Sequence, residues 1–505
     1  MDNPIPSLIT LAAAFSVVVV LRRFFGSKSS SPAPPLPPGP RKLPFVGNLF
    51  SVSKGREWEA YARLGRELNS DIIHLDMAGT HLIVLNSAQA VDDLLNKKSA
   101  LYSDRPRFTM LHDILRYDFS LTTMEYGPRW RKARRLLHQQ ANFETAKQFY
   151  ATQESASRRF LKSLLTDPVS LQKNIHRLIA ETILSFAYGL PIQRENDPLV
   201  GLSEAVTRIG MEAVTPGRFL VDSIPMLKHF PAWFPGAGFK RNLHEWRALG
   251  RSVVEAPFAQ AAGMPTLSFI TACLANSPME DEQAIKGVAA TMYTAGLDST
   301  MAAVSTFFLA MLANPEAQAT AQREIDAVTH GERLPDFSDR EKMPYVGALV
   351  KEVLRWHVVT PIAIPHRVTV EDEYKGYRIP AGAYVVGNMH ELLRDPTTFP
   401  DPDIFLPERF LDDSVARDMI GSIEIAYGFG RRICPGRYVA MATLWSTFSG
   451  VLATFDIAKA VDQHGDPIEP TYAYDSNLID APVPFECRII PRNEELAKLL
   501  SGEEE

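Results

Sequence analysis

One cysteine of this chain sits in a loop whose residues suit a metal ligand. The loop, residues 427–436, reads YGFGRRICPG, and its glycines allow sharp turns that bring the backbone close to a flat cofactor. The apolar run 438–452 predicts a helix after the loop, with Pro435 in its first turn, so Cys434 would lie where helix N–H groups stabilise a thiolate. We therefore predict that Cys434 is a thiolate ligand of haem iron, with Arg432 near a propionate. The alternative is a buried structural cysteine, the usual state of a free thiol.

A second candidate site lies inside a long apolar stretch. Residues 281–312 predict one helix, which ends at Asn314-Pro315. A glycine in its middle costs a helix about 1 kcal/mol relative to alanine, and the acid and two alcohols that follow are hard to explain by packing. Asp298, Ser299 and Thr300 are therefore candidate functional residues. The alternative for the alcohols is a hydrogen bond to the carbonyl four residues earlier.

Both stretches resemble motifs of the cytochrome P450 family. The haem-loop pattern FxxGxRxCxG matches at Gly430, Arg432, Cys434 and Gly436, with Tyr427 in place of phenylalanine. The oxygen-activation pattern AGxDTT matches at Ala295, Gly296, Asp298 and Thr300, with Ser299 in place of threonine. The resemblance implies haem b as cofactor, and a proton relay through the acid and the alcohol. Ser299 keeps the hydroxyl of threonine but lacks the methyl group that fixes its rotamer.

Further family motifs follow the same order along the chain. Glu352 and Arg355 lie three residues apart on a predicted helix, residues 344–357, and Arg409 lies in the tetrapeptide PERF. The resemblance implies that these three form a buried structural charge triad. It also implies haem propionate contacts from Trp130 and Arg134, which match WxxxR, and from His366 and Arg367.

The basic helix around Trp130 allows two interpretations. Its remaining cations, Arg131, Lys132 and Arg135, form either an ordinary solvated face or a docking patch for an acidic reductase. Over the whole chain of 505 residues the net charge is −6, which gives no support to nucleic-acid binding. The three cysteines, Cys273, Cys434 and Cys487, are too scattered for a disulfide framework or a zinc site, so we expect a reducing compartment.

The N-terminal region predicts attachment to a membrane. Residues 4–21 are almost wholly apolar, and positive charge follows them at Arg22, Arg23 and Lys28, which favours an uncleaved anchor with its C-terminal side in the cytoplasm. The predicted organisation is an anchor at 1–26, a polar and proline-rich hinge at 27–40, a haem-thiolate catalytic domain at 41–495 and an acidic tail at 496–505. Microsomal family members share this arrangement, so we expect a single-pass protein of the endoplasmic reticulum membrane with a cytosolic catalytic domain. The proline segment could alternatively bind an SH3-type partner.

The expected fold class is mainly α, a P450-type helical bundle around haem with small β-sheets at one edge. Extended stretches at residues 71–75, 81–85, 374–380 and 483–490 predict those sheets. The resemblance covers residues 37 to about 492, and it is strongest to fungal, basidiomycete enzymes of secondary metabolism. By family analogy, eight side chains line the substrate pocket: Phe108, Leu111, Phe219, Met292, Ala295, Ile362, Ile364 and Tyr474.

The function implied by the resemblance is that of a monooxygenase, an oxidoreductase. It would insert one oxygen atom of O2 into a lipophilic small molecule, a terpenoid or an aromatic metabolite, with electrons from NADPH through NADPH-cytochrome P450 reductase. A reductase-independent haem-thiolate isomerase or dehydratase is an alternative, but it commonly lacks the acid–alcohol pair. A haem-binding sensor would more often carry an output domain, and a structural membrane-anchored protein would need no haem.

Overall fold

The computed structural model describes residues 34–502, except 45, 53–54, 193–196, 216–217, 277–280, 412–422, 477 and 493. The predicted membrane anchor lies outside the described residues, as do residues 27–33 of the predicted hinge and the last three residues of the predicted acidic tail. The rest of the hinge packs on the body of the protein. The carbonyls of Pro35 and Pro38 accept hydrogen bonds from the backbone N–H groups of Arg378 (2.8 Å) and His74 (2.9 Å), and Pro37 is buried.

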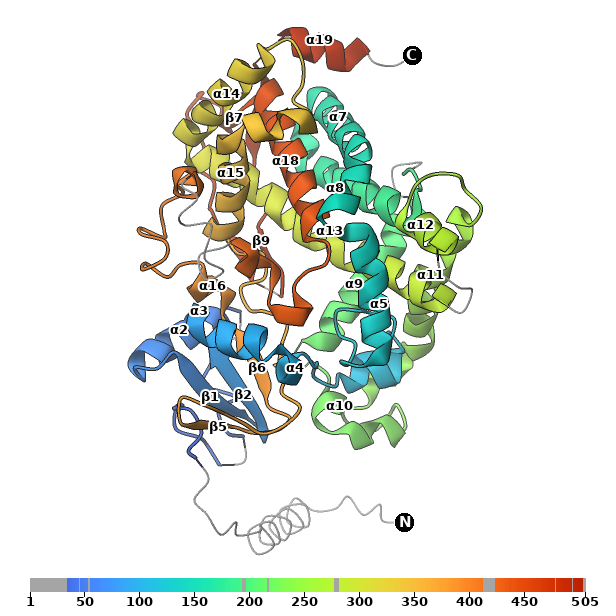
Figure 1. Ribbon diagram of the computed structural model, residues 1–505, viewed down its shortest axis with the longest axis vertical. Helices are drawn as coiled ribbons and strands as arrows, with labels where there is room; N and C mark the ends of the chain where they lie inside the picture. The colour runs from blue at the N-terminus through green and yellow to red at the C-terminus, as the bar shows by residue number, and fades with distance from the viewer. Residues whose placement is uncertain are drawn as a thin grey trace, which may run out of the picture.

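Helices make up most of the molecule and surround α13 (Glu282–Ala313), which crosses its centre (Figure 1). This helix and α15 (Pro344–Trp356) confirm the helices predicted at residues 281–312 and 344–357, because each end lies within one residue of the prediction. The other described helices are α2 (Glu57–Glu67), α3 (Ala88–Val91), α4 (Ser99–Tyr102), α5 (Pro128–Ala141), α6 (Phe143–Ala146), α7 (Tyr150–Thr166), α8 (Leu171–Tyr188), α9 (Pro198–Val214), α10 (Leu220–Ser223), α11 (Leu243–Ala261), α12 (Phe269–Asn276), α14 (Pro315–Thr329), α15 (Pro344–Trp356), α16 (Met389–Leu392), α18 (Arg437–Thr454) and α19 (Glu494–Gly502).

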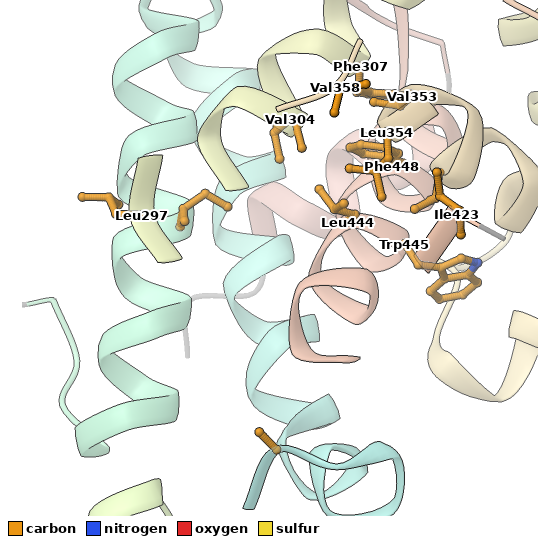
Figure 2. Close-up of a cluster of buried hydrophobic side chains, with 14 of the residues drawn as sticks. Leu297, Val304, Phe307, Val353, Leu354, Val358, Ile423, Leu444, Trp445 and Phe448 are labelled. Carbon is orange, nitrogen blue, oxygen red and sulfur yellow. The ribbon is translucent and has the colours of Figure 1, made fainter. Parts of the chain in front are cut away.

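The main core lies where α13, α15 and α18 meet. Figure 2 shows Leu297, Val304 and Phe307 of α13 in one buried cluster with side chains of α15 and α18. The rings of Phe307 and Phe448 stack with their centroids 4.0 Å apart, which holds α13 against α18. Because both helices are buried on nearly all sides over this part, their sequences read as apolar throughout rather than as amphipathic stripes.

Four small sheets lie in the described part of the chain, and the largest is at one end of the molecule (Figure 1). Its strand order is β1-β2-β6-β3, with β2 parallel to β6 and the other pairs antiparallel. The strands are β1 (Ile72–Met77), β2 (Thr80–Leu85), β3 (His366–Arg367), β4 (Asp372–Tyr374), β5 (Tyr377–Ile379), β6 (Tyr384–Gly387), β7 (Phe455–Lys459), β8 (Tyr474–Ser476), β9 (Asp480–Pro482) and β10 (Cys487–Pro491). A mainly α fold with small separate sheets is therefore confirmed.

Two of the predicted extended stretches differ in detail from the structure. Residues 374–380 are not one strand but the last residue of β4, the turn and the second arm of the β4–β5 hairpin. Lys375 (φ 51°) and Gly376 (φ 77°) form that turn, whose left-handed backbone matches the twist of a tight hairpin. Of residues 483–490 only the part from Cys487 onward is a strand, β10, which pairs with β7.

The C-terminal segment packs on the body. In α19, Leu496 and Leu500 are buried within the main core, and the helix contacts α7. The domain boundary predicted at residue 495 therefore falls inside this helix. Two leucines one helical turn apart bury one face of the segment that was predicted as an acidic tail.

Candidate functional site

At two positions of the loop before α18, the backbone has a conformation that glycine adopts without strain and other residues rarely do. Gly428 has φ 91° and Gly430 has φ 51°, and a Cβ atom at Gly430 would lie 2.1 Å from the carbonyl oxygen of Leu95. The N–H of Cys434 donates to the carbonyl of Tyr427 over 2.7 Å, which closes the loop. Residues 428–433 are thus folded back under the cysteine.

Cys434 is partly accessible and lies at the start of α18. Burial raises the pKa of its thiol, while the backbone N–H groups of Gly436 and Arg437 and the charges of Arg134 and Arg437 act in the opposite direction. A bound metal ion would add a larger positive charge and deprotonate the thiol outright. The sequence predicts Pro435 in the first turn of the helix. In the structure α18 begins at Arg437 with Gly436 as its N-cap, so Pro435 precedes the helix.

Tyr427 lies close behind the cysteine. Its hydroxyl is buried and has no hydrogen-bond partner among the described residues. Burial raises the pKa of this hydroxyl, and the nearby Cys434 raises it further. The replacement of the motif's phenylalanine therefore leaves one unsatisfied polar atom beside the sulfur.

Two buried arginines, Arg432 of this loop and Arg105 from a distant segment, bond to neutral groups. Arg432 donates to the carbonyls of Ser103 (2.7 Å), Leu121 (3.3 Å) and Met124 (2.8 Å), and its guanidinium lies 4.4 Å from the ring centroid of Trp130. Arg105 donates to the carbonyls of Thr122 (3.0 Å), Ile364 (2.5 Å) and Pro365 (2.9 Å).

Burial lowers the pKa of Arg432 to about 9, and it lowers the pKa of Arg105 together with the charge of Arg432. Neighbouring positive charge adds to this effect of burial, from Arg134 on Arg432 and from Arg432 on Arg105, while Asp104 opposes it at both arginines.

Arg134 and His366 extend this cluster. Burial and the charge of Arg437 lower the pKa of Arg134 to about 10, although Cys434 opposes the shift. His366 is buried, with Nδ1 2.7 Å from the carbonyl oxygen of Tyr102, and burial and the nearby Arg105 lower its pKa. The guanidinium of Arg367, also predicted as a propionate contact, forms an ion pair with Asp104.

Sequence reasoning missed Arg105 and Arg437. Arg437 directly follows the matched loop, so its position was a usable signal. Arg105 lies in no recognised motif, and only the fold brings it to the site.

The middle of α13 is accessible, unlike most of that helix. Ala295 is exposed, and Met292 and residues 298–301 are partly exposed, whereas residues 302–312 are buried. In α18 the accessible stretch likewise comes first, at residues 437–441, and the buried stretch follows. Both accessible stretches precede the stacked pair Phe307 and Phe448 that fixes the contact between the helices.

The acid and the two alcohols of α13 have different environments. Burial raises the pKa of Asp298, Glu204 on α9 raises it further, and His176 on α8 opposes the shift. Both hydroxyls donate to the carbonyl four residues earlier, Ser299 to Ala295 over 3.2 Å and Thr300 to Gly296 over 2.8 Å. The alternative local hydrogen bonds are therefore present in the structure.

Sequence comparisons identify the family of this site. Residues 37–479 match the family described as Cytochrome P450. A cytochrome P450 monooxygenase of Armillaria gallica is 39% identical over 99% of both chains. The chain belongs to the cytochrome P450 family. A cytochrome P450 monooxygenase of Rhodocybe pseudopiperita is 41% identical over 92% of this chain and 91% of its own. The tryptamine 4-monooxygenase of Psilocybe cyanescens is 36% identical over 92% of this chain and 95% of its own.

The P450 family implies haem, and the residues of this site fit it. Haem carries an iron that accepts a thiolate and two propionate carboxylates that need cations. Cys434 offers the sulfur, and Arg105, Arg134 and Arg432 offer positive charge; Arg105 and Arg432 donate to backbone carbonyls, which do not neutralise that charge. Buried charge of this kind is costly without a counterion, so two carboxylates complement the cluster.

The three residues predicted as the P450 charge triad meet in the structure. Glu352 and Arg355 are fully buried, and the carboxylate accepts from Nε (2.7 Å) and Nη2 (2.9 Å) of Arg355. Arg409 in η9 (Pro407–Phe410) donates from Nε to the same carboxylate over 3.3 Å. Every charge of the triad therefore has a partner.

The eight predicted pocket residues do not lie together but are spread over several regions of the P450 domain. Phe108, Leu111 and Phe219 pack in one cluster beneath α11, where Phe219 lies edge-on to Phe239 and Trp246. Ile362 packs against the cluster around β1 and β2, and Ile364 contributes its carbonyl to Arg105. Met292 and Ala295 lie on the accessible part of α13.

Tyr474 stacks on His357 and bonds to Thr306, so its partly buried ring is held against the core.

Proposed function

We propose that this P450 is a haem-thiolate monooxygenase of a fungal secondary-metabolite pathway, which inserts one oxygen atom of O2 into a lipophilic small molecule. Haem, when bound, supplies the iron that activates oxygen. The observation that carries the proposal is the position of Cys434, which lies under two backbone N–H groups and beside Arg134. These groups oppose the rise that burial causes in the pKa of the thiol, so they suit the sulfur to be the axial ligand of a bound iron.

Asp298, Ser299 and Thr300 are proposed to deliver protons. The raised pKa of Asp298 keeps its carboxyl protonated at higher pH than an ordinary carboxylic acid, so it can donate a proton. Ser299 makes the longer of the two local bonds, 3.2 Å against 2.8 Å for Thr300, and it lacks a methyl group on Cβ. Its hydroxyl can therefore leave the Ala295 carbonyl more easily and pass a proton onward.

The remaining site residues are proposed to hold the cofactor and the substrate. Arg134, Arg432 and Arg105 would pair with the propionates, Trp130 would support Arg432, and His366 would lie beside them. The accessible, apolar surface of Met292 and Ala295 suits a lipophilic substrate, terpenoid or aromatic. A related protein is named as a tryptamine 4-monooxygenase, which supports the aromatic class.

Electrons are proposed to come from NADPH through NADPH-cytochrome P450 reductase at the endoplasmic reticulum membrane. Among the described residues, α13 alone is long and apolar enough to cross a membrane, and 67% of its most apolar window is buried inside the domain. Support for attachment comes instead from the apolar run at residues 4–21 and from large apolar side chains that are exposed. Phe50 is 78% exposed and Trp233 is 77% exposed.

The ligand assignment is tested by single substitutions of the three cysteines. Cys434→Ala should abolish the absorbance band of the reduced, carbon monoxide-treated protein at the thiolate position. Cys273→Ala and Cys487→Ala are matched controls and should keep the band, because burial raises the pKa of both thiols to about 12. Loss of the band in either control with retention in Cys434→Ala would refute the assignment.

Dependence on a reductase separates monooxygenation from the other haem-thiolate reactions. The enzyme should form oxidised product from a lipophilic metabolite extract only with NADPH, reductase and O2 together. Product formed from a peroxide or an oxime without reductase would identify an isomerase or dehydratase instead.

A further inference from the structure

A cavity of about 510 Å³ lies away from the proposed haem site. It opens between the end of η2 (Thr109–Leu115), η5 (Pro225–His229), η6 (Gly238–Arg241) and the first turns of α11. This volume falls in the range of small-molecule binding sites, roughly 300–1,000 Å³. None of the motifs used for the proposed function contributes a residue to its lining, which consists of Asp113, Ile114, Arg116, Lys228, His229, Phe239, Lys240, Leu243 and Arg247.

The cavity lining is strongly basic. It contains four permanently positive side chains, those of Arg116, Lys228, Lys240 and Arg247, against the single carboxylate of Asp113. That carboxylate is already paired, because Lys228 Nζ lies 2.9 Å from it and Arg107 Nη2 lies 3.2 Å from it. The lining therefore keeps an excess of positive charge.

Neutral groups hold two of these cations in place. Lys240 donates to the carbonyls of Lys228 (2.7 Å) and Phe230 (2.5 Å), and Arg247 donates from Nε to the carbonyl of Ile114 over 2.7 Å. A carbonyl orients a cation without cancelling its charge, so the positive ends are fixed before any ligand arrives. Preorganised Arg and Lys side chains of this kind suit phosphate, which accepts several charge-assisted hydrogen bonds.

The basic cavity adjoins exposed apolar side chains on the same short segments. Within η5, Met226 is 69% exposed while Lys228 and His229 line the cavity. Trp233 lies in the loop between η5 and η6, and Leu220 and Ile224 of the preceding segment are also about half exposed. Figure 1 shows α10 at the same end of the molecule as the β1–β2 hairpin. An amphipathic ligand would find cations and apolar surface side by side here.

We propose that this cavity is a binding site for a phosphate group, with Arg116 and Lys228 as direct ligands and Lys240 and Arg247 as fixed positive neighbours. The phosphate can come from the headgroup of an anionic phospholipid or from a soluble phosphate. The two sources share the same recognition chemistry, and the adjoining apolar side chains favour the lipid.

The test uses the full chain in an uncharged detergent, with binding measured by isothermal titration calorimetry at constant ionic strength. Three probes are titrated: inorganic phosphate, dihexanoyl phosphatidic acid and dihexanoyl phosphatidylcholine. The variants are Arg116→Gln and Lys228→Gln. Arg241→Gln is the matched control, because Arg241 is exposed in η6 directly beside Lys240, carries the same charge and does not line the cavity.

We expect saturable binding of inorganic phosphate and phosphatidic acid, and weaker binding of the zwitterionic lipid. Each of Arg116→Gln and Lys228→Gln should raise Kd about 5-fold, as expected for one partly exposed ion pair, while Arg241→Gln leaves Kd within about 1.5-fold. Tighter binding of phosphatidic acid than of phosphate identifies the lipid source, and equal binding identifies a soluble phosphate.

The proposal is overturned if no probe saturates, or if both cavity variants bind like the Arg241→Gln control. It is also overturned if the cavity variants bind phosphate normally but lose affinity for the reductase, since the basic surface would then serve a protein partner.

Discussion

Removal of the Glu352 carboxylate should destabilise this P450 more than loss of any single surface ion pair. The carboxylate accepts four hydrogen bonds, two from Arg355, one from Arg409 and one from the backbone N–H of Leu406 at 2.7 Å. Glu352→Ala leaves the fully buried guanidinium of Arg355 without its counterion. Stranding a buried charge in this way costs about 3–5 kcal/mol, a large part of the roughly 5–15 kcal/mol that stabilises a typical folded domain.

Two further variants set a scale for this loss. Arg409→Gln removes one bond of 3.3 Å to the carboxylate but leaves Glu352 paired with Arg355, so we expect a cost of about 1–3 kcal/mol. Glu59→Ala breaks the exposed pair with Arg56, whose side chains are 55% and 48% exposed, and should cost about 0–1 kcal/mol. The predicted order of cost is therefore Glu352→Ala, then Arg409→Gln, then Glu59→Ala.

Urea denaturation followed by tryptophan fluorescence would measure these differences in the free energy of unfolding. If Glu352→Ala is too unstable to purify, Arg409→Gln and Glu59→Ala still give an ordered pair. The reasoning fails if Glu352→Ala is as stable as Glu59→Ala, or if Arg409→Gln is the more damaging of the two triad variants.

Three other outcomes are expected. Gly430→Ala should lower haem content sharply, because its Cβ would lie 2.1 Å from the Leu95 carbonyl oxygen. Gly347→Ala in α15 is the control and should keep full haem content, because Gly347 has open space around it. Equal haem content in both variants would contradict the loop geometry. Because burial raises the pKa of Asp298, its carboxyl donates protons below that raised pKa, and product formed per electron should fall as pH rises through it. Asp298→Asn should give low product per electron at every pH, with peroxide released, and an unchanged pH profile would remove Asp298 from the relay. Deletion of residues 1–31 should release the protein only partly from microsomes, since Trp233 and Met226 remain exposed, and complete release measured by sedimentation would exclude a second contact with the membrane.

Features of the site that depend on neighbouring residues could be predicted from the sequence. The glycine-flanked Cys434, the pair Glu352 and Arg355 on one helix face, and the ends of α13 and α15 all follow from spacing and from helix-breaking residues. Their signals are local because a helix or a tight loop is fixed by residues a few positions apart. The fold class could be predicted for the same reason, since helical periodicity runs through most of the chain.

The charge around the cysteine depends on contacts between distant segments, and only the tertiary structure determined it. Arg105 and Arg432 are more than 300 positions apart in the chain. In the fold, the charge of Arg432 lowers the pKa of Arg105, and both charges lower the pKa of His366. Arg367 forms an ion pair with Asp104, and no rule of residue spacing predicts that contact. The sequence by itself determined which residue could be a thiolate and which helices hold it. The folded chain determined which cations surround that thiolate, because burial and long-range packing, rather than sequence neighbours, set the electrostatic environment.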